Sequence, residues 1–269
     1  MLFRVSSCLQ WCKETGAAVE HWYGELIKLL GFVGELTLAL GDAVRRPHRI
    51  KWRSFAFYLD SCGSGAMPII ALLGTLIGVI LAFQALEQLS RYGAAGYVSN
   101  LVGTVIITEL GPLMTAVVLA GRSGSAFAAE LGSMKVREEI DALTTMGLPT
   151  GRFLLVPKVL ALLIALPGLN ILACVCGVFG GMLVIIAQVN ISAIEYYYKV
   201  TEVVRVADLA QGLLKSVIFG LIVAAVGCMK GLEAPRDAQG VGRAATSAIV
   251  MAIFLIIVVD AIITAIFSM

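Results

Sequence analysis

The chain has 269 residues, of which 59% are hydrophobic and 14% charged, and its mean hydropathy is +0.93. These values exclude an ordinary soluble domain and indicate an all-α integral membrane protein with one domain of several spans. The net charge of +2 gives no sign of a nucleic-acid partner, and the six cysteines lack the spacing of a secreted disulfide framework.

Residues 1–54 predict a helix at the membrane surface followed by a basic elbow. Along 9–44, polar residues recur every seven positions on an otherwise apolar helix, as Glu14, His21, Lys28, Glu35 and Asp42. Such a stripe is typical of an interfacial helix, although a helix packed lengthwise against spans would also show it. The basic run from Arg45 to Arg53 suits anionic headgroups. The first residues lack the apolar core of a signal peptide, so the N-terminal segment is expected not to be cleaved.

The membrane domain, residues 55–269, is predicted to contain five spans, at about 68–89, 97–120, 153–187, 209–229 and 244–267. Pro68 suits the first turn of a helix, and Gly74 with Gly78 forms a small-residue pair for helix packing. The third run exceeds the roughly 20 residues of an upright span. No charged turn divides it after Lys158, so we predict one long, kinked helix rather than a hairpin.

A small-residue helix and a charged helix follow the second span. Two ridges repeat every four residues and should let another backbone approach closely: Gly121, Ser125, Ala129 and Gly124, Ala128, Gly132. The run KVREEID at 135–141 cannot lie in hydrocarbon. Gly147 suits a left-handed C-cap, with Pro149 just beyond. We therefore predict a cytoplasmic helix over about 129–147 that binds a soluble partner.

The distribution of positive charge predicts the orientation. Sixteen lysines and arginines lie in residues 1–54, 122–158 and 230–243, against three in the two opposite loops. The N-terminus, the charged helix and the loop 230–243 are therefore expected on the cytoplasmic side. The C-terminus is expected on the outer side.

Ionisable residues inside spans are costly and therefore informative. Glu109 is about 18 Å into the second span, near the midplane, at 1.5 Å per residue. Lys215 and Asp260 each lie about 10 Å below the outer surface on adjacent antiparallel spans, which predicts an ion pair. Pro112 lacks an N–H and should disturb the helix near Thr108, so we expect Glu109 to line a cavity; a purely structural role for these groups remains open.

The sequence contains no nucleotide-binding loop of the form GxxxxGK[ST]. The histidines, His21 and His48, both lie in the N-terminal region, and no thiol within the spans has a histidine nearby to activate it. No metal site, catalytic group or cofactor is therefore predicted in this chain, and a membrane-embedded lipid-modifying enzyme is disfavoured.

Three blocks carry a resemblance to a known family: ELGPLMTAVVLAGRSGSAFAAELGSMKVREEIDALTTMG at 109–147, LLKSVIFG at 213–220 and GLEAPRDAQGVGRAAT at 231–246. With the span around Asp260, they make the chain from about Leu72 onward resemble the MlaE (YrbE) family. These permeases are membrane subunits of ABC transporters that move phospholipids and related lipids between bacterial membranes and across the chloroplast envelope. The resemblance implies a permease in the bacterial inner membrane.

The resemblance also implies partners and a site. The partners are a second copy of the chain, two copies of a cytoplasmic ATPase that bind ATP and Mg, and a periplasmic ring of MCE-domain proteins. The helix 129–147 would couple to the ATPase through Glu130, Lys135, Arg137, Glu138, Glu139 and Asp141. The phospholipid pocket would lie between the first two spans at the dimer centre, at Leu81, Leu89, Tyr92, Glu109 and Leu110. Thr108 stands where some members have an arginine, so no headgroup contact from that arginine is expected.

An ion-coupled secondary transporter or channel is the alternative function. It would use Glu109, Lys215 and Asp260 as an ion relay and would need no ATPase. Five spans show no inverted repeat of the kind that is common in such carriers, and the capped cytoplasmic helix would then have no partner.

Overall fold

The computed structural model describes residues 51–147, 151–189 and 191–268, together with isolated helical positions between 24 and 45. None of these residues lies in a strand. Five helical stretches are long and apolar enough to cross a membrane: Trp52–Arg91, Ala95–Val136, Phe153–Val189, Val206–Glu233 and Ala238–Phe267. The all-α fold with five candidate spans is thus confirmed, and the third stretch is one continuous run of helix from Phe153 to Val189. The predicted surface helix at 1–54 lies mostly outside the described residues.

The first stretch consists of α2 (Trp52–Gly63), a 3₁₀ turn η2 (Ser64–Ala66) and α3 (Met67–Arg91), with Pro68 in the first turn of α3. Glycines bring α3 against α8 (Val156–Val189). A Cβ atom on Gly78 would overlap the carbonyl oxygen of Gly177, and one on Gly180 would overlap that of Thr75. The two backbones therefore touch, as the small-residue pair in the sequence indicates.

The second stretch is not one regular helix. Its segments are η3 (Ala95–Tyr97), α4 (Val98–Val105), η4 (Ile106–Leu110), α5 (Gly111–Leu119), η5 (Ala120–Gly124) and α6 (Ser125–Val136). Both η4 and η5 are π-helical turns, a feature that often accompanies functional sites. The first ends just before Pro112, so the irregularity predicted around Thr108 is present.

Of the two small-residue ridges, one packs closely against α10 (Val206–Glu233). A Cβ atom on Gly227 would lie 2.6 Å from the carbonyl oxygen of Gly124, and one on Gly231 would lie 2.9 Å from that of Ala128. In the other ridge, a Cβ atom on Gly121 would have no described atom within 4 Å. At Gly121 the expected close approach does not occur within this chain.

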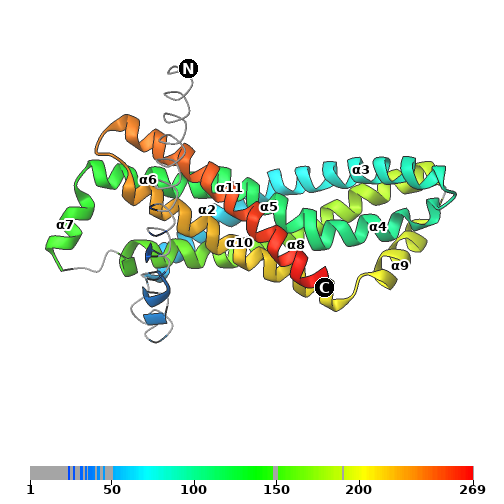
Figure 1. The fold of residues 1–269 in the computed structure, drawn as a ribbon, viewed down its shortest axis with the longest axis horizontal. Helices are drawn as coiled ribbons and strands as arrows, with labels where there is room; N and C mark the ends of the chain where they lie inside the picture. Colours follow the sequence, from blue (N-terminus) through cyan, green and yellow to red (C-terminus); the bar gives the residue numbers. More distant parts are fainter. Residues whose placement is uncertain are drawn as a thin grey trace, which may run out of the picture.

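The predicted helix at 129–147 is divided into two. α6 ends at Val136, Glu138 has a left-handed φ of 60°, and α7 covers Glu139–Thr145. Gly147, with φ 70°, follows α7 as the predicted C-cap. Figure 1 shows α7 at one end of an elongated bundle and α9 (Ala193–Val203) at the opposite end.

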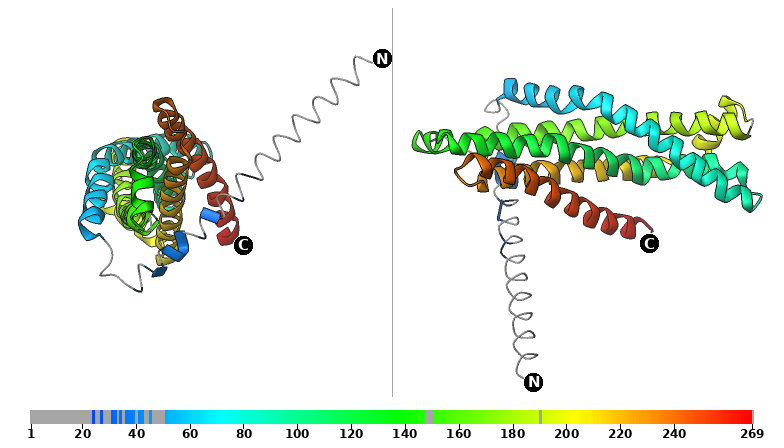
Figure 2. Two further views of the ribbon diagram at one scale, coloured as in Figure 1. Left: turned by 90° about the vertical axis from the view of Figure 1, so that its left-hand side faces the viewer. Right: turned by 90° about the horizontal axis from the view of Figure 1, so that it is seen from above.

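Helix α9 lies between the third and fourth predicted spans, where no helix is predicted. The Ser192 side chain caps it by accepting a hydrogen bond from the backbone N–H of Glu195 at 3.1 Å. Tyr196 is buried and donates to the carbonyl oxygen of Val178 at 3.2 Å, and burial raises the pKa of Tyr196 to about 12. The chain runs through α9 before it enters α10. As a result, α10 begins short of the end of the bundle that α3, α4 and α8 form (Figures 1 and 2).

The last helix, α11 (Ala238–Ser268), is the least buried of the candidate spans. It packs on α10 and α6 and diverges from the bundle toward the C-terminus (Figure 2). Its small residues Ala248 and Ala252 face the core, whereas Val250, Phe254 and Ile257 are exposed. A helix face with these exposed apolar side chains suits contact with lipid or with another membrane subunit.

Candidate functional site

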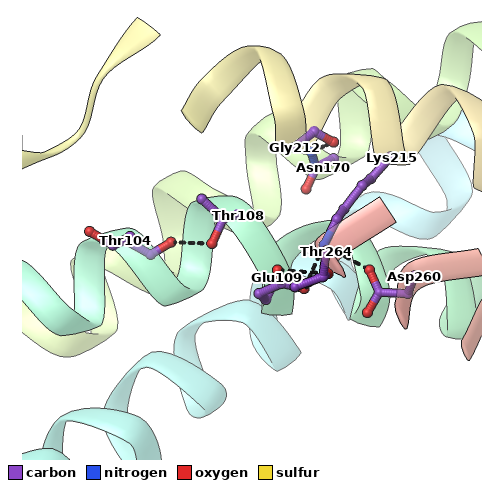
Figure 3. Close-up of polar contacts among 8 residues, drawn as sticks. All are labelled: Thr104, Thr108, Glu109, Asn170, Gly212, Lys215, Asp260 and Thr264. Carbon is purple, nitrogen blue, oxygen red and sulfur yellow. Dashed lines mark hydrogen bonds and ion pairs between the residues drawn. The ribbon is translucent and has the colours of Figure 1, made fainter. Parts of the chain in front are cut away.

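Three ionisable side chains from three helical segments meet inside the bundle (Figure 3). The Lys215 ammonium of α10 lies 2.6 Å from a carboxylate oxygen of Glu109 in η4 and 2.8 Å from one of Asp260 in α11. It also donates to the hydroxyl of Thr264 at 2.8 Å. Lys215 is fully buried, so its charge depends on these contacts for stabilisation.

The two carboxylates are held differently. Thr264 donates its hydroxyl to Glu109, at 3.1 Å from Oε1. Asp260 Oδ1 is within ion-pair distance of Lys215, but its geometry is not that of a hydrogen bond, and this buried oxygen has no hydrogen-bond partner among the described residues. When all three groups are ionised, two carboxylates share one ammonium and the cluster carries one excess negative charge.

The depths inferred from the sequence need correction. Counting from the span ends gave Glu109 and Lys215 different depths, yet the two side chains are in contact. The count assumed that the spans begin level with one another. In the structure α10 begins short of the end of α4, which brings Lys215 to the level of Glu109. The structure thus adds Glu109 to the Lys215–Asp260 contact.

The backbone around η4 explains how these groups meet. A Cβ atom on Gly212 would overlap the carbonyl oxygen of Ile107, so this glycine lets α10 approach the π-helical turn. Asn170 of α8 donates to the Gly212 carbonyl oxygen at 3.3 Å. Sequence reasoning missed Asn170 and Thr264 as members of the site. Thr264 was detectable, because it lies four residues after Asp260 on the same helical face.

An apolar hollow lies beside the charged cluster, between α3, α5 and α8. Its lining includes Leu73, Ile77, Leu110, Met114 and Val118. These side chains are apolar, so the lining suits hydrocarbon. Leu110 lines the hollow and directly follows Glu109 in the chain. The apolar hollow and the charged cluster are therefore adjacent.

The other predicted pocket residues lie elsewhere. Leu81 and Leu89 are partly buried and pack in an apolar cluster with residues of α4. Tyr92 follows the end of α3 and is 86% exposed. Of the five predicted positions, Leu110 alone lines the hollow, and Glu109 points to Lys215.

The residues predicted to contact an ATPase divide into two groups. Glu130, Lys135 and Asp141 are bound within the chain: Glu130 to Lys158, Lys135 to the Leu232 carbonyl oxygen at 2.6 Å, and Asp141 to Arg236 at 2.7 Å. Arg137, Glu138 and Glu139 are exposed near α7, with Arg137 and Glu139 3.8 Å apart. In the part of the chain that the structure describes, no group of three His, Cys, Asp or Glu side chains could hold a metal ion.

Comparison with known proteins identifies relatives of most of the chain. The family model described as permease MlaE matches residues 55–266. A probable ABC transporter permease protein of Rickettsia typhi is 35% identical over 202 residues, which cover 75% of this chain and 78% of that protein. The intermembrane phospholipid transport system permease protein MlaE of Haemophilus influenzae is 31% identical over 76% of this chain and 78% of its own. The chloroplastic protein TRIGALACTOSYLDIACYLGLYCEROL 1 of Arabidopsis thaliana is 31% identical over 81% of this chain and 63% of its own.

Proposed function

The chain belongs to the MlaE permease family, and we propose that it moves phospholipids or related lipids between the inner and outer membranes of a bacterium. It would do so as the membrane subunit of an ABC transporter. The observation that carries this proposal is the similarity to the H. influenzae permease, whose name specifies intermembrane phospholipid transport. The apolar hollow supports a lipid substrate, because burial of an acyl chain contributes about 0.8 kcal/mol per CH₂.

A separate ATPase would supply the energy. The sequence has no GxxxxGK[ST] loop, so ATP and Mg would bind to the partner rather than to this chain. The exposed charges Arg137, Glu138 and Glu139 beside α7 offer a docking surface at one end of the bundle. We further propose that two copies of the chain associate with two ATPase subunits.

The charge distribution supports an inner-membrane orientation with α7 in the cytoplasm and α9 in the periplasm. A ring of MCE-domain proteins would then receive or deliver lipid at the α9 end. In this arrangement lipid chains would occupy the hollow, and the polar part of the lipid would lie toward Glu109.

One observation favours a second candidate. The contact of Lys215 with both Glu109 and Asp260 would also suit a proton or ion relay in a secondary transporter. Such a transporter would work without an ATPase, so ATP dependence in reconstituted membranes separates the two functions.

The test is purification of the chain in mild detergent, followed by identification of bound proteins and lipidomics of the extract. We expect an ABC ATPase to co-purify and phospholipid to be enriched over an unrelated membrane protein prepared in parallel. Reconstituted complex should then move labelled phospholipid only with ATP. Transport driven by an ion gradient without ATP would reject the proposal.

A further inference from the structure

The chain turns sharply between α6 and α7, at a point where its sequence favours a continuous helix. No glycine or proline occurs from Ser133 to Met146. Even so, α6 ends at Val136 and Glu138 takes a left-handed φ of 60°. Among the described residues other than glycine, Glu138 alone has a positive φ. This conformation is unfavourable for an L-residue and persists only where surrounding contacts hold it.

The connection between α10 and α11 packs against α6 next to this turn. It spans residues 234–237. Ala234 is buried, and a Cβ atom on Gly132 of α6 would lie 3.2 Å from the Ala234 Cβ. The Lys135 ammonium donates to the carbonyl oxygen of Leu232, at the end of α10, at 2.6 Å. The end of α6 and the 234–237 connection therefore form one fixed base.

One ion pair joins α7 to this base. The guanidinium of Arg236 lies 2.7 Å from a carboxylate oxygen of Asp141, three residues after the strained Glu138. In the described part of the chain, it is the one hydrogen bond or ion pair that reaches a side chain of α7 from beyond residues 125–147. Both side chains are more than half exposed, so the pair adds little to the stability of the fold. Its effect is on the direction of α7, which Figure 1 shows turned away from the axis of α6.

We propose that Arg236 is a positioning residue for ATPase docking: through Asp141 it holds α7 in the turned orientation. Without this ion pair, the helical preference of residues 133–146 takes over, Glu138 relaxes to a right-handed φ, and α6 and α7 join into one straight helix. The exposed charges of α7 then point away from the position at which the ATPase meets them. The inference deepens the proposed function and rests on it for the identity of the partner, whereas the turn itself is a property of this chain.

The test measures the turn directly, as the distance between two spin labels on the full-length chain. The six native cysteines are replaced, and single cysteines are placed at Ala126 in α6 and Thr145 in α7, which are both exposed. Labelled chain is diluted with unlabelled chain in lipid nanodiscs, so that only distances within one chain are recorded. A straight helix would separate the two Cα atoms by about 28 Å, at 1.5 Å per residue, and the turn shortens this distance. We expect Arg236→Gln to shift the main distance toward that of the straight helix.

Two further variants show whether the ion pair is the cause. The exchange of Asp141→Arg with Arg236→Asp restores a pair of opposite polarity, so the native distance should return. Arg243→Gln is the matched control: it breaks a comparably exposed pair with Asp237 that does not reach α7, and should leave the distance unchanged. Because both pairs are exposed, the unfolding temperature of every variant should stay close to that of the native chain. A native distance in Arg236→Gln, or an exchange that does not restore it, would overturn the proposal.

Binding of the ATPase to the same preparations separates this inference from the proposed function. Arg236→Gln should weaken that binding by about two- to fivefold, the effect of one exposed ion pair, and the exchange should restore it. Unchanged binding despite a lengthened distance would reject the positioning role. A native distance with normal ATP hydrolysis in Arg236→Gln would reject the inference and leave the transporter assignment standing. If the native chain binds no ATPase while the distances respond as expected, the transporter assignment is rejected, and the hold of Arg236 on α7 stands.

Discussion

The buried Lys158 of α8 forms an ion pair with the partly exposed Glu130 of α6, and Tyr58 of α2 binds to both. Tyr58 donates to Glu130 Oε1 at 2.6 Å, and the Lys158 ammonium donates to the phenol oxygen at 2.9 Å. The ammonium also lies 4.2 Å from the ring centre of Tyr58 and 5.0 Å from that of Phe127. The helix that leads into α7 is thereby fastened to two other helices.

Replacing Glu130 by Ala should destabilise the chain by about 3 kcal/mol, because Lys158 would remain buried without its counter-ion. This is at the low end for a buried pair, since Glu130 is 42% exposed. The double variant with Lys158→Met should recover part of the loss. Thermal unfolding in detergent measures both effects, with additive losses contradicting a coupled pair. As a control, Lys199→Ala breaks the exposed pair with Glu195 and should cost less than about 1 kcal/mol.

At the second cluster, Lys215→Ala should be more damaging than Asp260→Ala. The first change leaves two carboxylates without their common cation, a loss of about 3–5 kcal/mol for a buried pair. The second leaves Lys215 paired with Glu109. The Lys215→Ala, Asp260→Ala double variant should be more stable than Lys215→Ala alone. Folded yield and unfolding temperature check this order, and equal losses from the two single changes would contradict it.

The contact between α3 and α8 gives a third prediction. Gly78→Ala should cost about 1–3 kcal/mol, the usual effect of overpacking, because its Cβ would overlap the Gly177 carbonyl oxygen. Gly168→Ala is the matched control: it lies within α8 with no described atom within 4 Å of an added Cβ. That change should be neutral or stabilising, by about 0.5–1 kcal/mol. A Gly78→Ala variant as stable as the control would show that the helices readily separate.

The spans were predictable because hydropathy depends on each segment alone. The absence of a charged turn from the run 153–187 predicts one helix, and α8 continues through Pro167. The missing N–H of Pro112 predicts a disturbed helix near Thr108, and the structure has a π-helical turn there. Both signals are local, so no knowledge of the tertiary structure was needed.

Features that depend on three-dimensional contacts were not predictable in the same way. The sequence could not show that α10 begins short of the end of α4. Counting residues from the span ends therefore gives Glu109 and Lys215 different depths. Nor could the sequence show that Glu130 turns inward to Lys158, because a charge next to KVREEID is expected to face water. The Gly121 and Gly124 ridges are equivalent in sequence, and the position of α10 alone decides which one packs.

The fourth prediction concerns the exposed charges near α7. Reversing Glu138 and Glu139 to Lys should abolish lipid-stimulated ATP hydrolysis while the permease stays folded, because both side chains are exposed at the end of the bundle. Glu195→Lys on α9, at the opposite end, is the control and should leave hydrolysis unchanged. ATPase co-purification and turnover are measured together. Normal assembly and turnover in the double reversal would place the ATPase contact elsewhere.

The last prediction concerns the apolar hollow. A photocrosslinking residue at Leu110 should capture phospholipid in cells, because Leu110 lines the hollow next to Glu109. The same residue at Phe254, exposed on α11, provides the background from surrounding lipid. Leu81 and Leu89 test the pocket expected from the family resemblance; they pack against α4 in the isolated chain and should capture less than Leu110.

Substitution at the same position separates binding from assembly. Leu110→Trp should fill part of the hollow and prevent capture by a crosslinker at Met114, while the ATPase still co-purifies. Leu110→Met, which is close in volume, is the matched control and should preserve capture. If Leu110→Trp leaves lipid capture and ATP-driven transport intact, the acyl chains bind outside this hollow. Stronger capture at Leu81 and Leu89 than at Leu110 would instead place them between α3 and α4.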